Sequence, residues 1–105
     1  MRMKAIIGLM VLMTPMSVQA QTAVQDRIEA GQALATRLCS SCHVVTSGAT
    51  GTGSDTAPPF AAIAAKRGDD SLQSFLMKPH GAMPPVDLST KEIDELIAYI
   101  ESLRK

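Results

Sequence analysis

The chain has 105 residues, and ten Lys plus Arg residues balance ten Asp plus Glu residues. This length allows one domain at most, and a net charge of zero excludes a basic nucleic-acid binder and an acidic tail protein. With 3% aromatic residues and two cysteines, the chain builds a poor core unaided and no multi-disulfide framework. A metal, a cofactor or a partner is therefore expected to supply apolar area.

Residues 1–20 have the pattern of a secretory signal peptide. Two basic residues precede the apolar run Ala5–Met13, and the residues from Val18 to Ala20 are a small-x-small cleavage signal. The apolar stretch up to Val18 has 14 residues, fewer than the roughly 17 to 25 that span a membrane. We expect cleavage after Ala20, a periplasmic mature chain of residues 21–105 with a formal charge of −2, and, before cleavage, a detached helical leader.

The first helix of the mature chain is predicted from about Thr22 to Ser41. Apolar and small residues recur there at steps of four and three, which places them on one helix face. A glycine in the middle of that face costs about 1 kcal/mol relative to alanine. Its presence predicts that another backbone passes close by. The residues of the face are Val24, Ile28, Gly31, Ala35 and Leu38.

The middle of the chain is predicted to hold a loop and two short helices. Residues 44–57 have no helical or strand period, and a loop of this length is typically functional or disordered. The Pro58-Pro59 pair then opens a short helix. Asp69 is predicted as the N-cap of a second one, Asp70–Met77.

The last helix has the clearest signals. Ser89 and Glu92 form a capping box, with serine at the cap and glutamate three residues on. An apolar stripe follows at helical spacing. No strand signal is present, so the predicted fold class is all-α, with helices joined by irregular loops. The stripe consists of Ile93, Leu96, Ile97, Ile100 and Leu103.

The segment Cys39-Ser40-Ser41-Cys42-His43 is C-x-x-C-H, the attachment sequence for haem c. On a helical turn, side chains at positions i and i+3 point the same way. The thiols of Cys39 and Cys42 then reach the two vinyl groups of one porphyrin, and His43 offers its imidazole to the iron. The motif therefore predicts one covalently attached haem c.

Three other interpretations of the motif fit less well. A thioredoxin-like redox pair belongs to an α/β pattern, which is missing here. A zinc site takes about four ligands, and only His80 remains beside the three motif residues. A structural disulfide leaves His43 unexplained. A bound haem would also compensate for the small hydrophobic core. Burial of its apolar face would stabilise the folded protein by on the order of 10 kcal/mol, at about 25 cal/mol per Å².

Three residues are candidates for the sixth ligand of the iron: Met77, His80 and Met83. Met83 is favoured because two prolines follow it, and a residue before proline is held extended on an irregular loop. Met77 lies on a predicted helix, where methionine more often packs in a core. His80 is the second choice. A thioether ligand raises the potential and closes the iron to oxygen and substrates.

The second ring nitrogen of a ligating histidine normally donates to a carbonyl or carboxylate. Pro58 is the candidate for this carbonyl, because it follows the loop that leaves His43 and cannot itself continue a helix.

The sequence resembles the small class I c-type cytochromes of bacterial type. The matching stretches are residues 31–43, 57–64, 75–85 and 88–103, which together span nearly the whole mature chain. The resemblance implies the all-α cytochrome c fold, three to five helices around one covalently bound haem.

The same resemblance implies a site and a helix crossing. His43 and Met83 are the implied axial ligands, and Pro58 is the implied carbonyl partner of His43. The first and last helices are implied to cross near Gly31 and Tyr99. The sequence differs from the family pattern at two positions that affect side-chain packing and not the ligands. The family often has a larger residue near Ala35, and it usually has a glycine where this chain has Val44.

The expected function is one-electron transfer by a carrier in a bacterial respiratory or dehydrogenase chain, without enzymatic catalysis. Its expected partners are redox proteins, one electron donor and one electron acceptor. We expect no nucleic-acid partner, and no stable membrane span after the signal peptide is cleaved. One alternative is a haem-bearing subunit fixed in a larger oxidoreductase complex. Another is an open-site haem that binds small ligands, if Met83 is not the sixth ligand.

Overall fold

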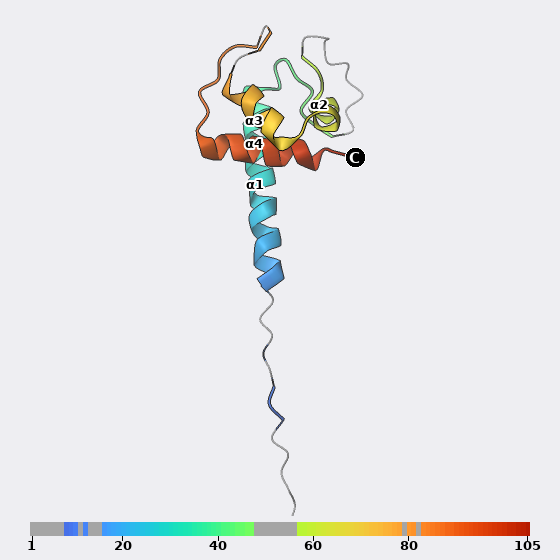
Figure 1. Ribbon diagram of the computed structural model, residues 1–105, viewed down its shortest axis with the longest axis vertical. Helices are drawn as coiled ribbons and strands as arrows, with labels where there is room; N and C mark the ends of the chain where they lie inside the picture. The colour runs from blue at the N-terminus through green and yellow to red at the C-terminus, as the bar shows by residue number, and fades with distance from the viewer. Residues whose placement is uncertain (1–7, 11, 13–15, 48–56, 79, 82) are drawn as a thin grey trace, which may run out of the picture.

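The computed structural model describes residues 8–10, 12, 16–47, 57–78, 80–81 and 83–105. It contains α1 (Met16–Leu38), α2 (Phe60–Lys66), α3 (Asp69–Met77) and α4 (Thr90–Ser102) in chain order. No strand is found in these ranges. Helix α4 contacts each of the other three helices. It crosses α1, and α2 and α3 pack against it (Figure 1). The all-α fold and the crossing of the first and last helices are thus confirmed.

Helix α1 is longer at its N-terminus than predicted, because nothing between Ser17 and Thr22 breaks a helix. Residues 18–27 are all exposed, and this part of α1 projects away from the other helices (Figure 1). The prediction of a detached helical leader over residues 1–20 is wrong in the described residues, because 8–10 and 12 are exposed and not helical and residues 16–20 form the first part of α1. Within the described ranges, no helix is long and apolar enough to cross a membrane.

The buried face of α1 differs in part from the predicted one. Ala35 is buried and Ile28 packs on the core, as predicted, and Leu34 belongs to the core as well. Val24 and Leu38, at the two ends of the predicted face, are 45% and 37% exposed. The crossing helix α4 covers only a short stretch of α1 (Figure 1), so apolar residues beyond that stretch stay in solvent.

Gly31 lies where the backbones of α1 and α4 come closest. A Cβ atom at this position would stand 1.9 Å from the carbonyl oxygen of Glu95 and 2.8 Å from the Cβ of Tyr99. Ordinary contacts begin at about 3.4 Å or more, so only glycine fits this approach. The predicted passage of another backbone at Gly31 is confirmed.

The short helices begin close to the predicted places. Pro59 precedes α2, and Gly68 is the N-cap of α3 without any side-chain hydrogen bond. The prediction that Asp69 is the cap was wrong by one residue. Asp69 and Asp70 lie instead in the first turn of α3, where a negative charge is favourable to the helix dipole. The predicted loop 44–57 is described only at its ends, since residues 48–56 lie outside the described ranges, as do Pro79 and Ala82.

The capping box of α4 is confirmed in both directions. The Ser89 hydroxyl accepts from the Glu92 N–H at 3.2 Å, and the Glu92 carboxylate accepts from the Ser89 N–H at 2.8 Å. The bond from the Ser89 N–H, and next the Ser89 hydroxyl beside the carboxylate, hold the pKa of Glu92 below its usual value. Of the predicted stripe, Ile97 is partly buried and the other four are buried: Ile93, Leu96, Ile100 and Leu103.

The helix crossing makes a testable prediction about stability. Replacement of Gly31 by leucine places four carbons where a single Cβ already meets the Glu95 carbonyl. Overpacking of this kind costs about 1 to 3 kcal/mol, so the midpoint of denaturant unfolding of the haem-loaded protein should fall. The visible spectrum of the folded fraction should stay unchanged.

Ala33 provides the matched control, because it lies two residues further along α1 and is exposed. Ala33→Leu should change the free energy of unfolding by less than about 0.5 kcal/mol, so its denaturant midpoint should stay close to that of the parent protein. If Gly31→Leu behaves like Ala33→Leu, the two helices do not approach each other at Gly31.

Candidate functional site

The C-x-x-C-H motif forms a turn that continues from the C-terminus of α1. The Cys39 N–H donates to the Ala35 carbonyl at 2.9 Å, and the His43 N–H donates to the Cys39 carbonyl at 2.9 Å. Neither cysteine is in a disulfide; Cys39 is half-buried and Cys42 is exposed. Burial raises the pKa of the Cys39 thiol. The end of α1 therefore offers one inward and one surface thiol beside a histidine.

His43 is held by the segment that enters α2. Its Nδ1 lies 2.7 Å from the carbonyl oxygen of Pro58, and its ring packs against Phe60 with centroids 5.3 Å apart. A carbonyl only accepts hydrogen bonds, so Nδ1 is the nitrogen that donates, and Nε2 keeps a lone pair for a metal. The Phe60 N–H donates to the Val44 carbonyl at 2.9 Å, which joins the two ends of the loop that follows the motif.

A cleft opens between the motif, α2, α3 and the segment before α4. Cys39, His43, His80 and Met83 all line it. The rest of the lining is apolar apart from one arginine, and the exposed Cys42 is not part of it. These other lining residues are Pro58, Phe60, Ile63, Arg67, Leu72, Phe75, Leu76 and Ile100.

The structure separates the three candidates for a second ligand. Met77 is 64% exposed and does not line the cleft. Met83 and His80 are half-buried and both line it. The Nδ1 atom of His80 donates to the Phe75 carbonyl at 3.2 Å, which leaves Nε2 as an acceptor. The geometry thus narrows the choice to Met83 and His80.

Met83 is positioned by a turn that sequence reasoning did not foresee. Its N–H donates to the His80 carbonyl at 3.0 Å. Gly81 lies within this turn at φ +55°, a conformation that glycine adopts without the steric penalty of a side chain. The turn and the following prolines together fix the backbone from which the Met83 thioether projects.

Two further residues contact the site in ways that the sequence analysis did not predict. The hydroxyl of Tyr99, on α4, donates to the carbonyl of Val45, two residues after His43. Burial raises the pKa of the Tyr99 phenol, so the hydroxyl keeps the proton that it donates. Arg67, between α2 and α3, is half-buried and lines the cleft. Both residues contact segments that are distant in the sequence, and a pattern of neighbouring residues cannot predict such contacts.

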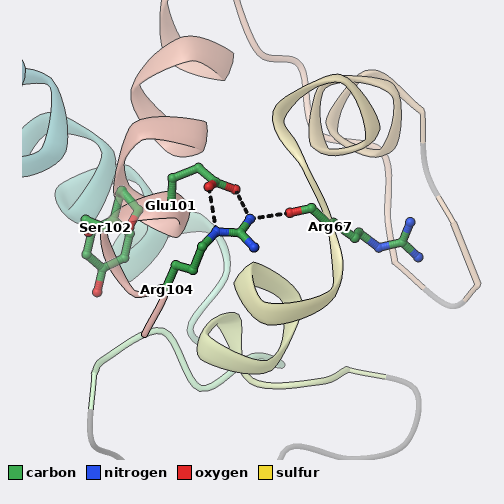
Figure 2. Close-up of polar contacts among 5 residues, drawn as sticks. Arg67, Glu101, Ser102 and Arg104 are labelled. Atoms are coloured by element: carbon green, nitrogen blue, oxygen red, sulfur yellow. Dashed lines mark hydrogen bonds and ion pairs between the residues drawn. The ribbon is translucent and has the colours of Figure 1, made fainter.

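The backbone at Arg67 is fixed from the C-terminus of the chain. Arg104 donates to the Arg67 carbonyl at 2.6 Å and is itself held by the Glu101 carboxylate at 2.8 Å. Figure 2 shows Arg104 between these two groups, with the guanidinium of Arg67 directed away from it. The connector between α2 and α3 is therefore anchored to the end of α4.

The donor set fits a porphyrin better than a bare metal ion. No group of three or more His, Cys, Asp or Glu residues gathers in the described ranges. The imidazole of His43 and the thioether of Met83 line a mostly apolar cleft, with the Cys39 thiol on its wall and the Cys42 thiol outside it on the same turn. These groups suit a planar apolar molecule whose own nitrogens hold the metal.

Two comparisons with known proteins match the chain. The family model described as "Cytochrome C oxidase, cbb3-type, subunit III" matches residues 26–100. Cytochrome c-552 of Bradyrhizobium diazoefficiens is 44% identical over 77 residues, which cover 70% of this chain and 72% of that protein. No solved structure matches the chain. Because the family model covers most of the chain and the matched region includes the whole C-x-x-C-H motif, the chain belongs to this family of small c-type cytochromes.

Proposed function

We propose that the mature chain is a one-electron carrier with a single, six-coordinate haem c, working in a bacterial respiratory or dehydrogenase chain. Membership of the cytochrome c family implies covalently bound haem c and redox partner proteins. The observation that carries the finer proposal is the cleft in which Cys39, His43 and Met83 meet on an apolar lining.

In this proposal each site residue has one task. Cys39 and Cys42 add their S–H groups across the haem vinyl groups and hold the haem as thioethers. His43 binds the iron through Nε2, while the Pro58 carbonyl, 2.7 Å from Nδ1, holds the ring and its tautomer. Met83, on the lining of the same cleft, would supply the second protein ligand to the iron. When bound, the haem would supply one-electron chemistry at its iron, and a thioether from Met83 would favour the ferrous state.

The closed iron distinguishes a carrier from an enzyme. With His43 and Met83 both bound to the iron, oxygen and substrates would have no open coordination site, and only an electron would be exchanged. The exposure of Cys42 supports exchange at the thioether edge of the haem. Donor and acceptor are redox proteins that meet this edge.

We also propose export to the periplasm with cleavage after Ala20. The support is that residues 18–27 are exposed and that core packing on α1 starts at Ile28. Loss of residues 1–20 therefore removes none of the core residues that the structure describes. N-terminal sequencing of the protein from a periplasmic extract should begin at Gln21.

A haem-bearing subunit fixed in a larger oxidoreductase complex is the second candidate. It is favoured by the description of the family model, which names a subunit of an oxidase. Native gel filtration of haem-stained extracts separates the two candidates. A carrier elutes at the size of the mature chain, whereas a fixed subunit elutes with a much larger complex or stays in the membrane fraction.

Covalent attachment is the first prediction from the site. Acid–acetone extraction should leave the haem on the protein, because thioether bonds resist acid. The intact mass should exceed that of residues 21–105 by one haem. Replacement of both Cys39 and Cys42 by alanine should release all haem into the acetone. A mature protein with two free thiols, with a disulfide or with two haems would contradict the proposal.

Met83 as sixth ligand is the second prediction. Met83→Ala should abolish the weak band near the red edge of the oxidised spectrum, which arises from sulfur-to-iron charge transfer. It should also let carbon monoxide bind to the reduced protein. The midpoint potential should fall by at least about 59 mV, a tenfold change for a one-electron couple, because the thioether favours ferrous iron.

Met77→Ala is the matched control, since this methionine is 64% exposed and lies outside the cleft; it should change none of the three signals. His80→Ala tests the competing ligand. If His80→Ala opens the iron to carbon monoxide and Met83→Ala does not, the assignment of Met83 is wrong.

A further inference from the structure

A second groove lies between α1, α3 and α4, and none of its described lining residues belongs to the cleft of the C-x-x-C-H motif. Its apolar lining comes from two helices. Ile28 of α1 and Ile97 of α4 are half-buried against the core, and Ala98 is half-buried as well. Val24, in the part of α1 that projects beyond the crossing, is 45% exposed (Figure 1). The apolar surface of this α1/α3/α4 groove is thus partly accessible from outside.

The α1/α3/α4 groove also carries an excess of negative charge. Its lining includes the carboxylates of Asp69, Asp70, Asp94 and Glu101. Arg27 is the one cation among the described lining residues. Arg104, outside the lining, binds Glu101 and lies within electrostatic range of Asp69. The other two carboxylates are exposed and belong to no ion pair found in the described ranges.

The arrangement of these carboxylates suits several separate cations and not one metal ion. In the part of the chain that the structure describes, no three or more His, Cys, Asp or Glu residues gather as a metal ion requires. Lysine and arginine side chains on one protein segment supply separate cations, and their neighbours supply apolar contacts. A bilayer with anionic headgroups would meet like charge here, and so would a second copy of this chain that offered the same groove.

We infer that the α1/α3/α4 groove is a docking surface for a basic amphipathic helix of a partner protein. Apolar side chains of that helix pack on Val24, Ile28 and Ile97, and its lysines and arginines lie along Asp70 and Asp94. A helix suits the groove because helices frame it on three sides, and neighbouring helices interdigitate their side chains with about 8 to 10 Å between their axes.

The docking surface and the cleft use different residues of α3. Leu72 and Phe75 line the cleft, whereas Asp70 and Gln73 line the groove. A partner in the groove therefore does not compete with haem for the cleft, and the cytochrome gains a place by which it is held while electrons pass elsewhere. The inference goes beyond the proposed function, because no groove residue is a proposed ligand or attachment point of the haem.

The test is a titration of the mature, haem-loaded protein in its reduced, diamagnetic state, followed through its backbone amide signals. The probe is a peptide of about 14 leucine and lysine residues in the pattern of an amphipathic helix. The amides of Ile28, Asp70 and Ala98 should shift, and that of His43 should not. A leucine–glutamate peptide of the same pattern should bind at least about tenfold more weakly, because like charges face each other in the groove.

Two variants separate the charged contacts from the apolar ones. Asp94→Asn should weaken binding of the leucine–lysine peptide about threefold at about 0.1 M salt. Asp87→Asn is the matched control, since Asp87 is exposed and does not line the groove; it should leave the affinity unchanged. Val24→Ser should weaken binding about threefold at both about 0.1 M and about 1 M salt, because apolar contacts are not screened. All three residues are exposed, and an unchanged visible spectrum checks the fold of each variant.

Several outcomes would overturn the inference. They are equal affinities for Asp94→Asn and Asp87→Asn, equal binding of the two peptides, and shifts confined to the residues around His43. Groove amides that shift with protein concentration alone would identify a second copy as the occupant, and shifts with phosphatidylglycerol vesicles would identify a membrane; either result contradicts a partner helix. A protein that binds the peptide in the groove but has an iron open to carbon monoxide contradicts the proposed function and not this inference.

Discussion

The approach of two backbones at Gly31 is the contact on which the site depends. The carbonyl of Glu95 occupies the space that any Cβ at position 31 would need, so α1 and α4 meet without intervening side chains. This contact sets the direction in which α1 delivers Cys39 to the cleft. It also brings Tyr99, whose Cβ faces Gly31, into position to hold the Val45 carbonyl. One glycine thus orients the segments on both sides of His43.

The rest of the cleft is tied to this crossing by polar contacts between segments. The Val44 carbonyl receives the Phe60 N–H, and the Pro58 carbonyl faces His43. On the opposite side, Arg104 joins the end of α4 to the connector that carries Arg67. The apolar wall is therefore framed by backbone carbonyls, which accept hydrogen bonds at fixed positions and do not change charge with pH. Such a frame suits a site that must keep one geometry in two oxidation states.

Family membership and site geometry bear on different parts of the function. The family model and cytochrome c-552 assign the chain to the c-type cytochromes, and this implies haem and electron transfer. The cleft adds which side chains gather on one apolar lining, and the exposed Met77 is not among them. The choice between a carrier and a fixed subunit depends on the surface that a partner meets.

Signals confined to a few neighbouring residues could be predicted from the sequence. They are the C-x-x-C-H motif, the Ser89 capping box and the costly glycine on the face of α1. Each depends on a turn of helix and needs no knowledge of the rest of the chain. The helix ends were predicted less well, because Gly68 and Asp69 are both acceptable caps and only the backbone path selects one of them.

Tertiary structure alone decided the contacts between segments that are distant in sequence. Tyr99 reaches a carbonyl 54 residues away, and Arg67 becomes part of the cleft only because α2, α3 and α4 converge there. The short overlap of α1 with α4 leaves Val24 and Leu38 partly exposed, although their spacing matches that of the buried residues. Periodicity reports which side of a helix is apolar, whereas the length and angle of the crossing determine how much of that side is covered.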